Sequence, residues 1–316
     1  MKDGMSLTKR LYGRLAAAYH LCKWEYRFRC LRQPKARGHI TPTEDEYQKI
    51  AGDLTDAGIK VVDFHLDVDD YWTYVNATDL YRQKQYYGGH EGKTFPEKSL
   101  EHYVATKLLE PNAEDVYVDV ASQHSPVPDI YAQRFGCTVY KQDLSYPDGL
   151  HDGCIGGDAA AMPVPDAFAS KMALHCSFEH FENDSDIRFI REIQRVLRPG
   201  GRVCIVPLYL NSRYTIYTDP AVHPPTGLTF ESDATLCCVS RFRNRHARQY
   251  DVAHFVERIQ HALDALSLTI YRITNAPDVH PSCYAHFAAV FEKPVAVSPK
   301  SAPAIRQLAQ VDRRKT

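Results

Sequence analysis

The sequence predicts an α/β fold with a doubly wound, mostly parallel sheet, and two observations lead to that prediction. Residues 116–120 (VYVDV) are a β-branched and aromatic run, followed by a loop of small residues and prolines. A helix expected over about 129–135 ends at Gly136, and residues 138–140 begin a second strand that closes at Asp143. A strand, a helix and a strand within about thirty residues form a βαβ unit, which implies parallel strands and a right-handed crossover.

Three aspartates follow successive predicted strands. Asp119 closes the first strand, Asp143 closes the second, and Asp158 follows a Gly156-Gly157 pair. Ligands of such sheets bind beyond the carboxyl ends of the strands. We therefore expect the three carboxylates to lie at one binding edge.

Four segments resemble class I S-adenosylmethionine-dependent methyltransferases, especially the ubiquinone/menaquinone methyltransferase branch. They read VYVDVAS, VYKQDLS, GDAAAMPVPDAF and EIQRVLRPGGRVCIVPLY, and the resemblance covers roughly residues 96–293. It implies a Rossmann-like sheet of seven strands, whose last two strands form a hairpin with one antiparallel strand. It also implies S-adenosyl-L-methionine as the cofactor.

The resemblance also assigns parts of this cofactor to particular residues. Asp143 matches the acidic residue that accepts hydrogen bonds from the ribose hydroxyls, and Asp158 matches the one that accepts from the adenine amino group. For both aspartates a role in an ordinary turn remains the alternative. The other cofactor-binding candidates follow strand ends in the same motifs: Asp119, Ala121, Ser122, Leu144, Ala159, Met162 and His175.

The first loop departs from the family's pattern. The family has roughly D-x-G-x-G-x-G here, because glycine lets the backbone approach the amino-acid part of the cofactor closely. In this chain residues 119–126 read DVASQHSP. A modified pose, weak binding and a site without function all remain open. We favour a working but altered loop, since Asp143, Asp158 and the turn at 198–201 are all kept.

Histidines are the candidates for acid–base work. Methyl transfer from a sulfonium needs mainly orientation and desolvation. A hydroxyl acceptor must also lose its proton to a base, for which histidine is the usual choice. His175, which ends the fourth strand, is the first candidate, with His124 and His223 as rivals. For Glu179 and His180 we expect helix capping or core contacts.

Two segments outside the motifs are expected to contact the acceptor. The extension over 1–95 ends in a tyrosine-rich stretch that often forms a lid in the family, and residues 209–248 are a long insertion at the ligand edge. Packed tyrosines and solvated arginines are the alternatives. The aromatic residues and arginines of these segments hint weakly at an anionic or sugar-like acceptor. The substrate candidates are Tyr87, Tyr209, His223 and Arg241. Arg243, Arg245 and Arg248 belong to the same group of arginines as Arg241.

The chain divides into an extension (1–95), a methyltransferase-like domain (96–293) and a tail expected to be flexible (294–316). Residues 1–37 carry ten basic and two acidic residues, with apolar residues at helical spacing. Such a basic amphipathic helix suits a peripheral membrane surface or self-association. Alternatively, the acidic stretch at 44–70 neutralises it.

Composition excludes several classes of protein. With 38 basic and 39 acidic residues, charge gives no argument for a nucleic-acid partner. Nine cysteines without a CxxC pair indicate free thiols of a reducing compartment and no metal site. No apolar run reaches the roughly 20 residues of a transmembrane helix, and no signal peptide is apparent. We expect a cytoplasmic protein.

The sequence therefore favours an S-adenosylmethionine-dependent methyltransferase that acts on a small-molecule substrate. One alternative is a non-catalytic S-adenosylmethionine-binding or scaffold protein, because the glycines of the first loop are missing. Another is a nicotinamide-dependent oxidoreductase, because Asp143 would suit a ribose in that class as well. The absence of a GxGxxG motif argues against the oxidoreductase.

Overall fold

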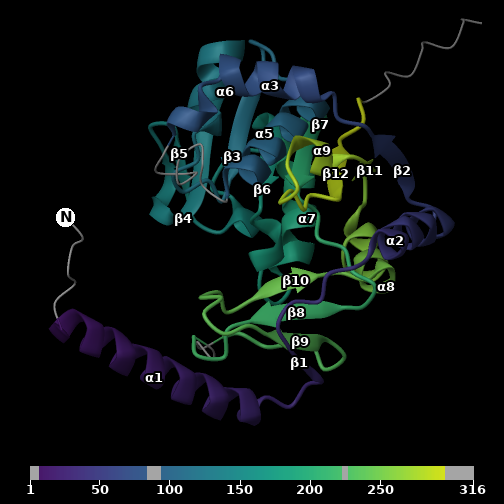
Figure 1. The fold of residues 1–316 in the computed structure, drawn as a ribbon. Coiled ribbons are helices and arrows are strands. Elements are labelled where there is room, and N and C mark those ends of the chain that lie inside the picture. Colours follow the sequence, from purple (N-terminus) through teal and green to yellow (C-terminus); the bar gives the residue numbers. More distant parts are fainter. Residues whose placement is uncertain (1–6, 84–93, 223–226, 296–316) are drawn as a thin grey trace, which may run out of the picture.

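The computed structural model describes residues 7–83, 94–222 and 227–295. A large sheet of eight strands forms the upper body of the molecule in Figure 1. From one edge to the other its strands are β2 (Lys60–Phe64), β11 (Ser267–Ile273), β12 (Phe287–Glu292), β7 (Leu197–Val206), β6 (Ala169–His175), β3 (Val116–Val120), β4 (Thr138–His151) and β5 (Cys154–Gly156).

The predicted mostly parallel sheet is confirmed. β3 pairs in parallel with β4 and β6, β6 pairs in parallel with β7, and the hairpin β11–β12 places antiparallel β12 beside β7. The resemblance implied seven strands, whereas the described residues form eight. The additional strand is β2, which pairs in parallel with β11 at the outer edge.

Helices cover both faces of this sheet, as expected for a doubly wound fold. Alternate strand residues face opposite sides: Val118 and Leu174 pack into one core, and Tyr117 and Ala173 pack into the other. The first core is completed by α2 (Glu44–Asp56), α7 (Ser185–Val196) and α8 (Val252–Arg258). The second is completed by α3 (Val68–Ala77), α5 (Phe95–Leu109), α6 (Val127–Phe135) and α9 (Ala276–Val279).

Local sequence explains where several helices begin and end. Thr43 and Glu46 form a capping box at the start of α2, and Gly136 ends α6 with a left-handed φ of 74°. Short 3₁₀ turns connect other elements, namely η1 (Leu80–Arg82), η2 (Ala159–Ala161), η3 (Phe178–His180) and η4 (Gln260–Ala262).

The insertion expected as a long loop forms most of a second, four-stranded sheet. Its order is β1 (Lys35–Arg37), β9 (Thr235–Cys238), β8 (Thr215–Thr218) and β10 (Ala247–Gln249), so the N-terminal segment supplies one edge strand. Figure 1 shows this small sheet below the large one. Ile216 and Leu236 join the core that contains Phe189 of α7, which ties the small sheet to that face of the large sheet.

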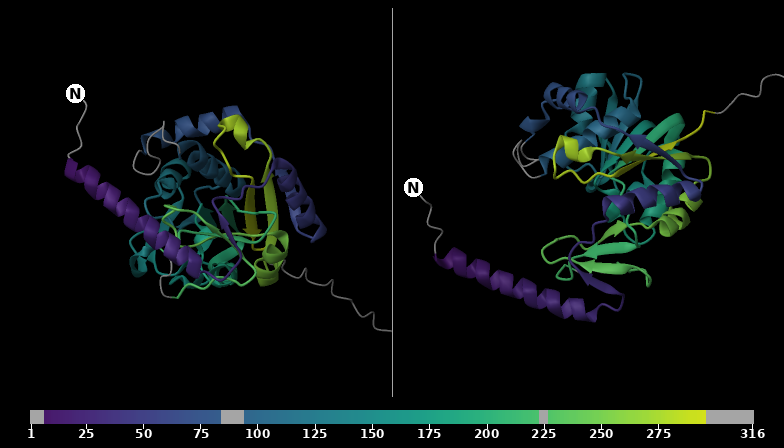
Figure 2. Two further views of the ribbon diagram at one scale, coloured as in Figure 1. Left: turned by 60° about the horizontal axis from the view of Figure 1, so that its bottom comes forward. Right: turned by 45° about the vertical axis from the view of Figure 1, so that its right-hand side comes forward.

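The basic N-terminal segment forms one continuous helix, α1 (Leu7–Cys30). Its C-terminal part is anchored by Trp24, which is buried and stacks on Phe28, while Arg37 lies over both rings. The helix then projects away from the small sheet (Figure 2). Within the described residues no helix has the length and apolarity needed to cross a membrane.

A buried arginine joins the two sheets. Arg248 of β10 is only 1% exposed and forms an ion pair of 2.9 Å with Asp186 in the first turn of α7. Its guanidinium also donates to the carbonyl oxygens of Phe181 and Asn183, at 3.1 and 2.9 Å, in the segment between β6 and α7. Burial raises the pKa of the Asp186 carboxyl. Hydrogen bonds from Arg258 and the charge of Arg248 outweigh this effect and hold that pKa below its usual value. Arg248 is therefore neither solvated nor free for an acceptor.

We predict that Arg248→Ala lowers the free energy of unfolding by about 3 kcal/mol or more, because buried acceptors lose their charged partner. Denaturant titration measures this loss. Arg191→Ala, at an exposed position of α7, is the matched control and should change stability by no more than about 0.5 kcal/mol. Equal effects of the two substitutions would contradict the role given to Arg248.

Candidate functional site

The carboxyl ends of β3 and β5 are joined by the buried side chain of Gln142, which lies in the middle of β4. Its Oε1 accepts a hydrogen bond from the Ala121 N–H at 3.2 Å, and its Nε2 donates to the Gly157 carbonyl oxygen at 2.7 Å. One amide thus links the loop after β3 to the loop after β5. These two hydrogen bonds hold together the two loops of the expected ligand edge.

Asp143 reinforces the same junction. Its Oδ2 accepts from the Gln123 N–H at 3.1 Å, and its Oδ1 accepts from the Ser145 N–H at 2.8 Å. A carboxylate offers about four acceptor positions, so each oxygen retains one for a ligand hydroxyl. Asp143 therefore shapes the first loop and still presents acceptors at the ligand edge.

The first loop keeps the backbone form that glycine favours. Ala121 has φ of 54° and Gln123 has φ of 40°, both in the left-handed region, and they occupy the positions of the first two glycines in the family's pattern. For residues with a Cβ this conformation costs roughly 1–2 kcal/mol each. The hydrogen bonds that these two N–H groups donate to Gln142 and Asp143 offset that cost.

A cavity of about 670 Å³ opens at this edge, and we call it the strand-end cavity. The Leu144 side chain at this cavity is 77% exposed, which is unusual for leucine, and Ala159 is buried nearby. Asp158 caps η2 by accepting from the Ala160 N–H at 2.9 Å and forms an ion pair with Arg188 at 3.1 Å. The lining residues are Ala121, Gln123, Gln142, Asp143, Leu144, Ser145, Asp158, Ala159, His180, Phe181, Glu182, Ser185 and Arg245.

The connection from β4 to β5 has no crossover helix. β4 continues past Asp143 to His151, and its outer part folds back along β5, where Gly149 pairs with Gly156. A Cβ at Gly156 would lie only 1.8 Å from the carbonyl oxygen of Pro147, so no larger residue fits there. This close approach explains the glycine that precedes Gly157 and Asp158 in the sequence.

Other predicted cofactor residues lie behind the cavity wall. Ser122 is buried, and its N–H donates to the Gln142 carbonyl oxygen at 2.9 Å. Met162 packs in the core, and its N–H donates to Glu192 Oε1 at 2.8 Å. Neither belongs to the described lining of the strand-end cavity.

Asp119 and His175 form a buried pair on the α5 side of the sheet. His175 Nε2 lies 3.8 Å from Asp119 Oδ1, which also accepts from the Tyr117 hydroxyl at 3.2 Å. The His175 ring meets the His102 ring of α5 edge-on, with centroids 4.6 Å apart. Burial raises the pKa of Asp119 to about 7 and lowers that of His175 to about 3.

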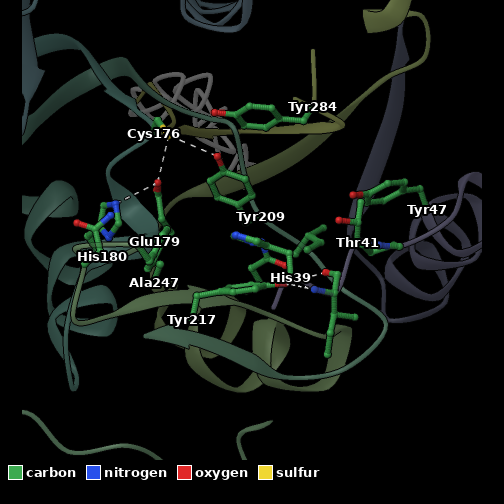
Figure 3. A pocket seen from close by; sticks show the side chains of 16 residues that line it. His39, Thr41, Tyr47, Cys176, Glu179, His180, Tyr209, Tyr217, Ala247 and Tyr284 are labelled. Atoms are coloured by element: carbon green, nitrogen blue, oxygen red, sulfur yellow. Dashed lines mark hydrogen bonds and ion pairs between the residues drawn. The ribbon is translucent and has the colours of Figure 1, made fainter. Parts of the chain in front are cut away.

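A second cavity, of about 460 Å³, lies between the large and small sheets, and we call it the aromatic pocket. Figure 3 shows Cys176, Glu179 and His180 gathered at one side of it and Tyr47 at the other. His180 lines both this pocket and the strand-end cavity. The complete lining is His39, Ile40, Thr41, Pro42, Tyr47, Cys176, Glu179, His180, Tyr209, Leu210, Tyr217, Phe242, Asn244, Ala247, Gln249 and Tyr284.

Hydrogen bonds orient the polar side of the aromatic pocket. His180 Nδ1 lies 2.7 Å from the His246 carbonyl oxygen, which requires a hydrogen on Nδ1 and leaves Nε2 of the neutral ring as an acceptor. That Nε2 lies 3.6 Å from Glu179 Oε1, and Cys176 Sγ lies 3.3 Å from the same oxygen. Burial raises the pKa of Cys176 well above its ordinary value, so Cys176 is a thiol donor and not a nucleophile.

The remaining candidates are dispersed. Tyr209 lines the aromatic pocket, whereas Arg241 lies in an exposed turn and lines neither cavity. His124 is exposed and lines a separate cavity of about 850 Å³ that also includes Tyr146. Outside the described residues lie the two candidates Tyr87 and His223.

Sequence reasoning did not place most of the aromatic pocket. His39 and Tyr47 come from the N-terminal extension, Phe242 comes from the insertion, and Tyr284 precedes β12. No periodicity links these positions. Tyr209 was the one lining residue named as a substrate candidate, and for the Glu-His pair at 179–180 helix capping or core contacts were expected.

Comparison with known proteins gives a family match over part of the large sheet. Residues 119–205 match the family model described as a methyltransferase domain. This stretch runs from Asp119 in β3 to Ile205 in β7, so it includes every described lining residue of the strand-end cavity except Arg245. No curated protein matches the chain.

Solved structures share a general likeness. The 1,6-didemethyltoxoflavin-N1-methyltransferase of Burkholderia thailandensis, solved with 1,6-didemethyltoxoflavin and S-adenosylhomocysteine, is 13% identical, with 81% of this chain and 93% of that chain covered and a TM-score of 0.43. The Pyrococcus horikoshii protein PH0226 is 14% identical, with coverage of 61% and 87% and a TM-score of 0.39. The [4+2]-cyclase SpnF is 12% identical, with coverage of 75% and 99% and a TM-score of 0.38. The function proposed below does not depend on these three likenesses.

The buried carboxyl of Asp119 predicts a pH-dependent stability. Its folded pKa lies above the ordinary value, so its contribution is fully present below about pH 4 and is lost as pH rises through about 7. Relative to Asp119→Asn, which cannot ionise, the wild-type free energy of unfolding should fall by about 2 kcal/mol or more between about pH 4 and pH 8. Denaturant titration at several pH values measures the difference.

The exposed residue Asp152 provides the control for this experiment, because Asp152→Asn should track the wild type at every pH. A constant difference between wild type and Asp119→Asn across that range would show that Asp119 is ionised in the folded protein.

Proposed function

We propose that this protein is an S-adenosylmethionine-dependent methyltransferase that acts on a small-molecule acceptor. One observation carries the proposal: a cavity at the carboxyl ends of β3, β4 and β5 adjoins an aromatic-lined pocket, and His180 borders both. The methyltransferase-domain match over 119–205 supports the same function. A ligand edge of this sheet type is where a nucleoside cofactor is expected.

The strand-end cavity suits S-adenosylmethionine in size and in chemistry. Its volume of about 670 Å³ is within the range of small-molecule sites. Asp143 retains acceptors for the ribose hydroxyls, Asp158 offers a carboxylate, and the apolar Leu144 and Ala159 suit an adenine face. The cofactor would supply an electrophilic methyl group on a positively charged sulfur.

Among the residues that the structure describes, His180 is the group best placed to accept a proton. Its Nδ1–H is fixed by the His246 carbonyl oxygen, which leaves Nε2 as the basic atom between the two cavities. A proton taken up at Nε2 would be stabilised by Glu179 Oε1, 3.6 Å away. The low pKa of His175 makes it a weak base, and His124 lines a different cavity. We therefore regard both as weaker candidates for the base than His180.

Titration calorimetry with S-adenosylhomocysteine tests the cofactor half of the proposal. We expect the wild type to bind it at one site, and Asp143→Asn to bind at least about tenfold more weakly, because an amide replaces one acceptor oxygen by a donor. Asp63→Asn, in the outer strand β2, is the matched control and should bind like the wild type. NADH serves as the competing ligand for an oxidoreductase and should give no heat.

If the wild type binds neither S-adenosylmethionine nor S-adenosylhomocysteine, the proposal is overturned. Unchanged binding by Asp143→Asn would overturn the role of Asp143 alone.

A screen of small aromatic compounds with methyl-labelled S-adenosylmethionine tests the catalytic half. With an acceptor from this screen, His180→Gln should lower kcat about 100-fold while the Kd for S-adenosylhomocysteine changes less than about threefold. Asn244→Ala, on the rim of the pocket, controls for a mere change of lining. Cofactor binding without transfer to any compound would instead favour the non-catalytic binding protein.

A further inference from the structure

Helix α1 presents a stripe of apolar residues to solvent. Leu11, Leu15 and Cys22 recur at spacings of four and seven residues, which place them on one face of a helix with about 3.6 residues per turn. Leu11 is 59% exposed and Leu15 is 62% exposed. Three exposed tyrosines, spaced seven residues apart, run along one side of this face: Tyr12, Tyr19 and Tyr26. We call these six residues the apolar stripe.

The opposite face of α1 holds the helix to the loops of the small sheet. His20, Trp24 and Arg27 share this face, because they too are spaced by four and three residues. His20 Nε2 lies 3.8 Å from Asp219 Oδ2, and Arg27 Nη1 donates to the Ala221 carbonyl oxygen at 3.2 Å. Trp24 is buried. The apolar stripe therefore faces away from the body of the protein, from which α1 projects (Figure 2).

Positive charge surrounds the apolar stripe. Residues 7–30 contain six Lys or Arg residues and one acidic residue, Glu25, which pairs with Arg29 at 3.1 Å. By their places in the helix, Arg14 and Lys23 lie at the two borders of the stripe. Acidic residues of the stretch at 44–70 pair with cations outside α1, namely Asp53 with Lys49, Asp63 with Arg272 and Asp70 with Lys107. These ion pairs do not neutralise α1.

We propose that α1 lies on the surface of a lipid bilayer that contains anionic lipids, with the apolar stripe directed into the boundary between headgroups and acyl chains. A helix with Lys and Arg beside an apolar face binds such a surface through buried apolar area and through attraction to anionic headgroups. Tyrosine rings and the long stems of Arg14 and Lys23 suit this boundary, because each has an apolar body and a polar end. Since the stripe faces away from both sheets, the rest of the protein stays in water.

Two protein segments that could cover the apolar stripe fit it less well. Two α1 helices packed on each other would bring charges of the same sign together, which is unfavourable. The tail at 296–316 has the same sign of charge, with five basic residues and one acidic residue. Elsewhere on a second copy, the exposed large apolar residues that the structure describes are spread over separate segments: Trp72, Leu144, Leu150, Val222, Tyr284 and Val295. Charge therefore favours an anionic bilayer over a protein occupant from this chain.

Co-sedimentation of the full chain with lipid vesicles tests the proposal, and its readout is independent of methyl transfer. One set of vesicles contains phosphatidylcholine alone, and the other contains equal parts of phosphatidylcholine and phosphatidylserine. We expect the wild type to bind the anionic vesicles at least about tenfold more tightly. Leu11→Ser combined with Leu15→Ser should weaken that binding at least about fivefold, because two apolar side chains no longer enter the bilayer boundary.

Ala16→Ser combined with Ala17→Ser is the matched control, because it places two serines in the same part of α1 but outside the apolar stripe. This variant should bind within about twofold of the wild type. Circular dichroism and thermal unfolding confirm that both variants are folded.

Wild-type binding to neither kind of vesicle, equal binding to both kinds, or equal effects of the two double substitutions overturns the proposal. Light scattering without vesicles tests the second copy as the occupant. A dimer that Leu11→Ser and Leu15→Ser dissociate, and that the control substitutions leave intact, would assign the apolar stripe to self-association and likewise overturn the proposal.

Discussion

The buried ion pair between Arg248 and Asp186 is the interaction on which the rest of the structure depends. It joins β10 of the small sheet to the start of α7, and the same guanidinium holds the carbonyl groups of Phe181 and Asn183. That segment carries His180. A buried charge destabilises the fold unless hydrogen-bond acceptors or opposite charges surround it. The guanidinium of Arg248 therefore requires these partners at these positions. The neighbours of Arg248 in β10, Ala247 and Gln249, line the aromatic pocket, so the same contacts position that wall of the pocket.

Hydrogen bonds to side chains, rather than an ion pair, stabilise the ligand edge of the large sheet. Glycine normally lets the first loop of such a site bend closely, and here Ala121 and Gln123 adopt the same backbone form. The side chains of Gln142 and Asp143 supply the hydrogen bonds that hold them there. A missing glycine pattern is therefore compatible with a preserved loop shape when neighbouring side chains restrain the backbone.

Much of the fold could be predicted from local sequence, because local physics determines it. The run VYVDV, Gly136 after α6 and the capping residues Thr43 and Glu46 each specify their own element. The left-handed φ of Gln123 could not be predicted, since it depends on a hydrogen bond to Asp143, twenty residues away. The burial of Arg248 could not be predicted either, because its partners come from three separate segments, namely 181–186, Tyr214 and Glu231.

The two cavities of the proposed site differ in how far their residues could be predicted from sequence. Asp143, Leu144 and Asp158 were identifiable because they follow strands in a recognisable order. The aromatic pocket was not, because its rings are brought together by the pairing of β1 with β9 and by the docking of the small sheet.

The pairing of β1 with β9 has a consequence for how such a protein changes over time. The matched stretch at 119–205 contains nearly the whole strand-end cavity, whereas most of the aromatic pocket is formed by the extension, the insertion and the segment before β12. On the proposed function, substitutions in those outlying parts would alter the choice of acceptor and leave the strand-end cavity unchanged. Descendants of one ancestor could thus diverge in chemistry while their shared stretch stays nearly constant.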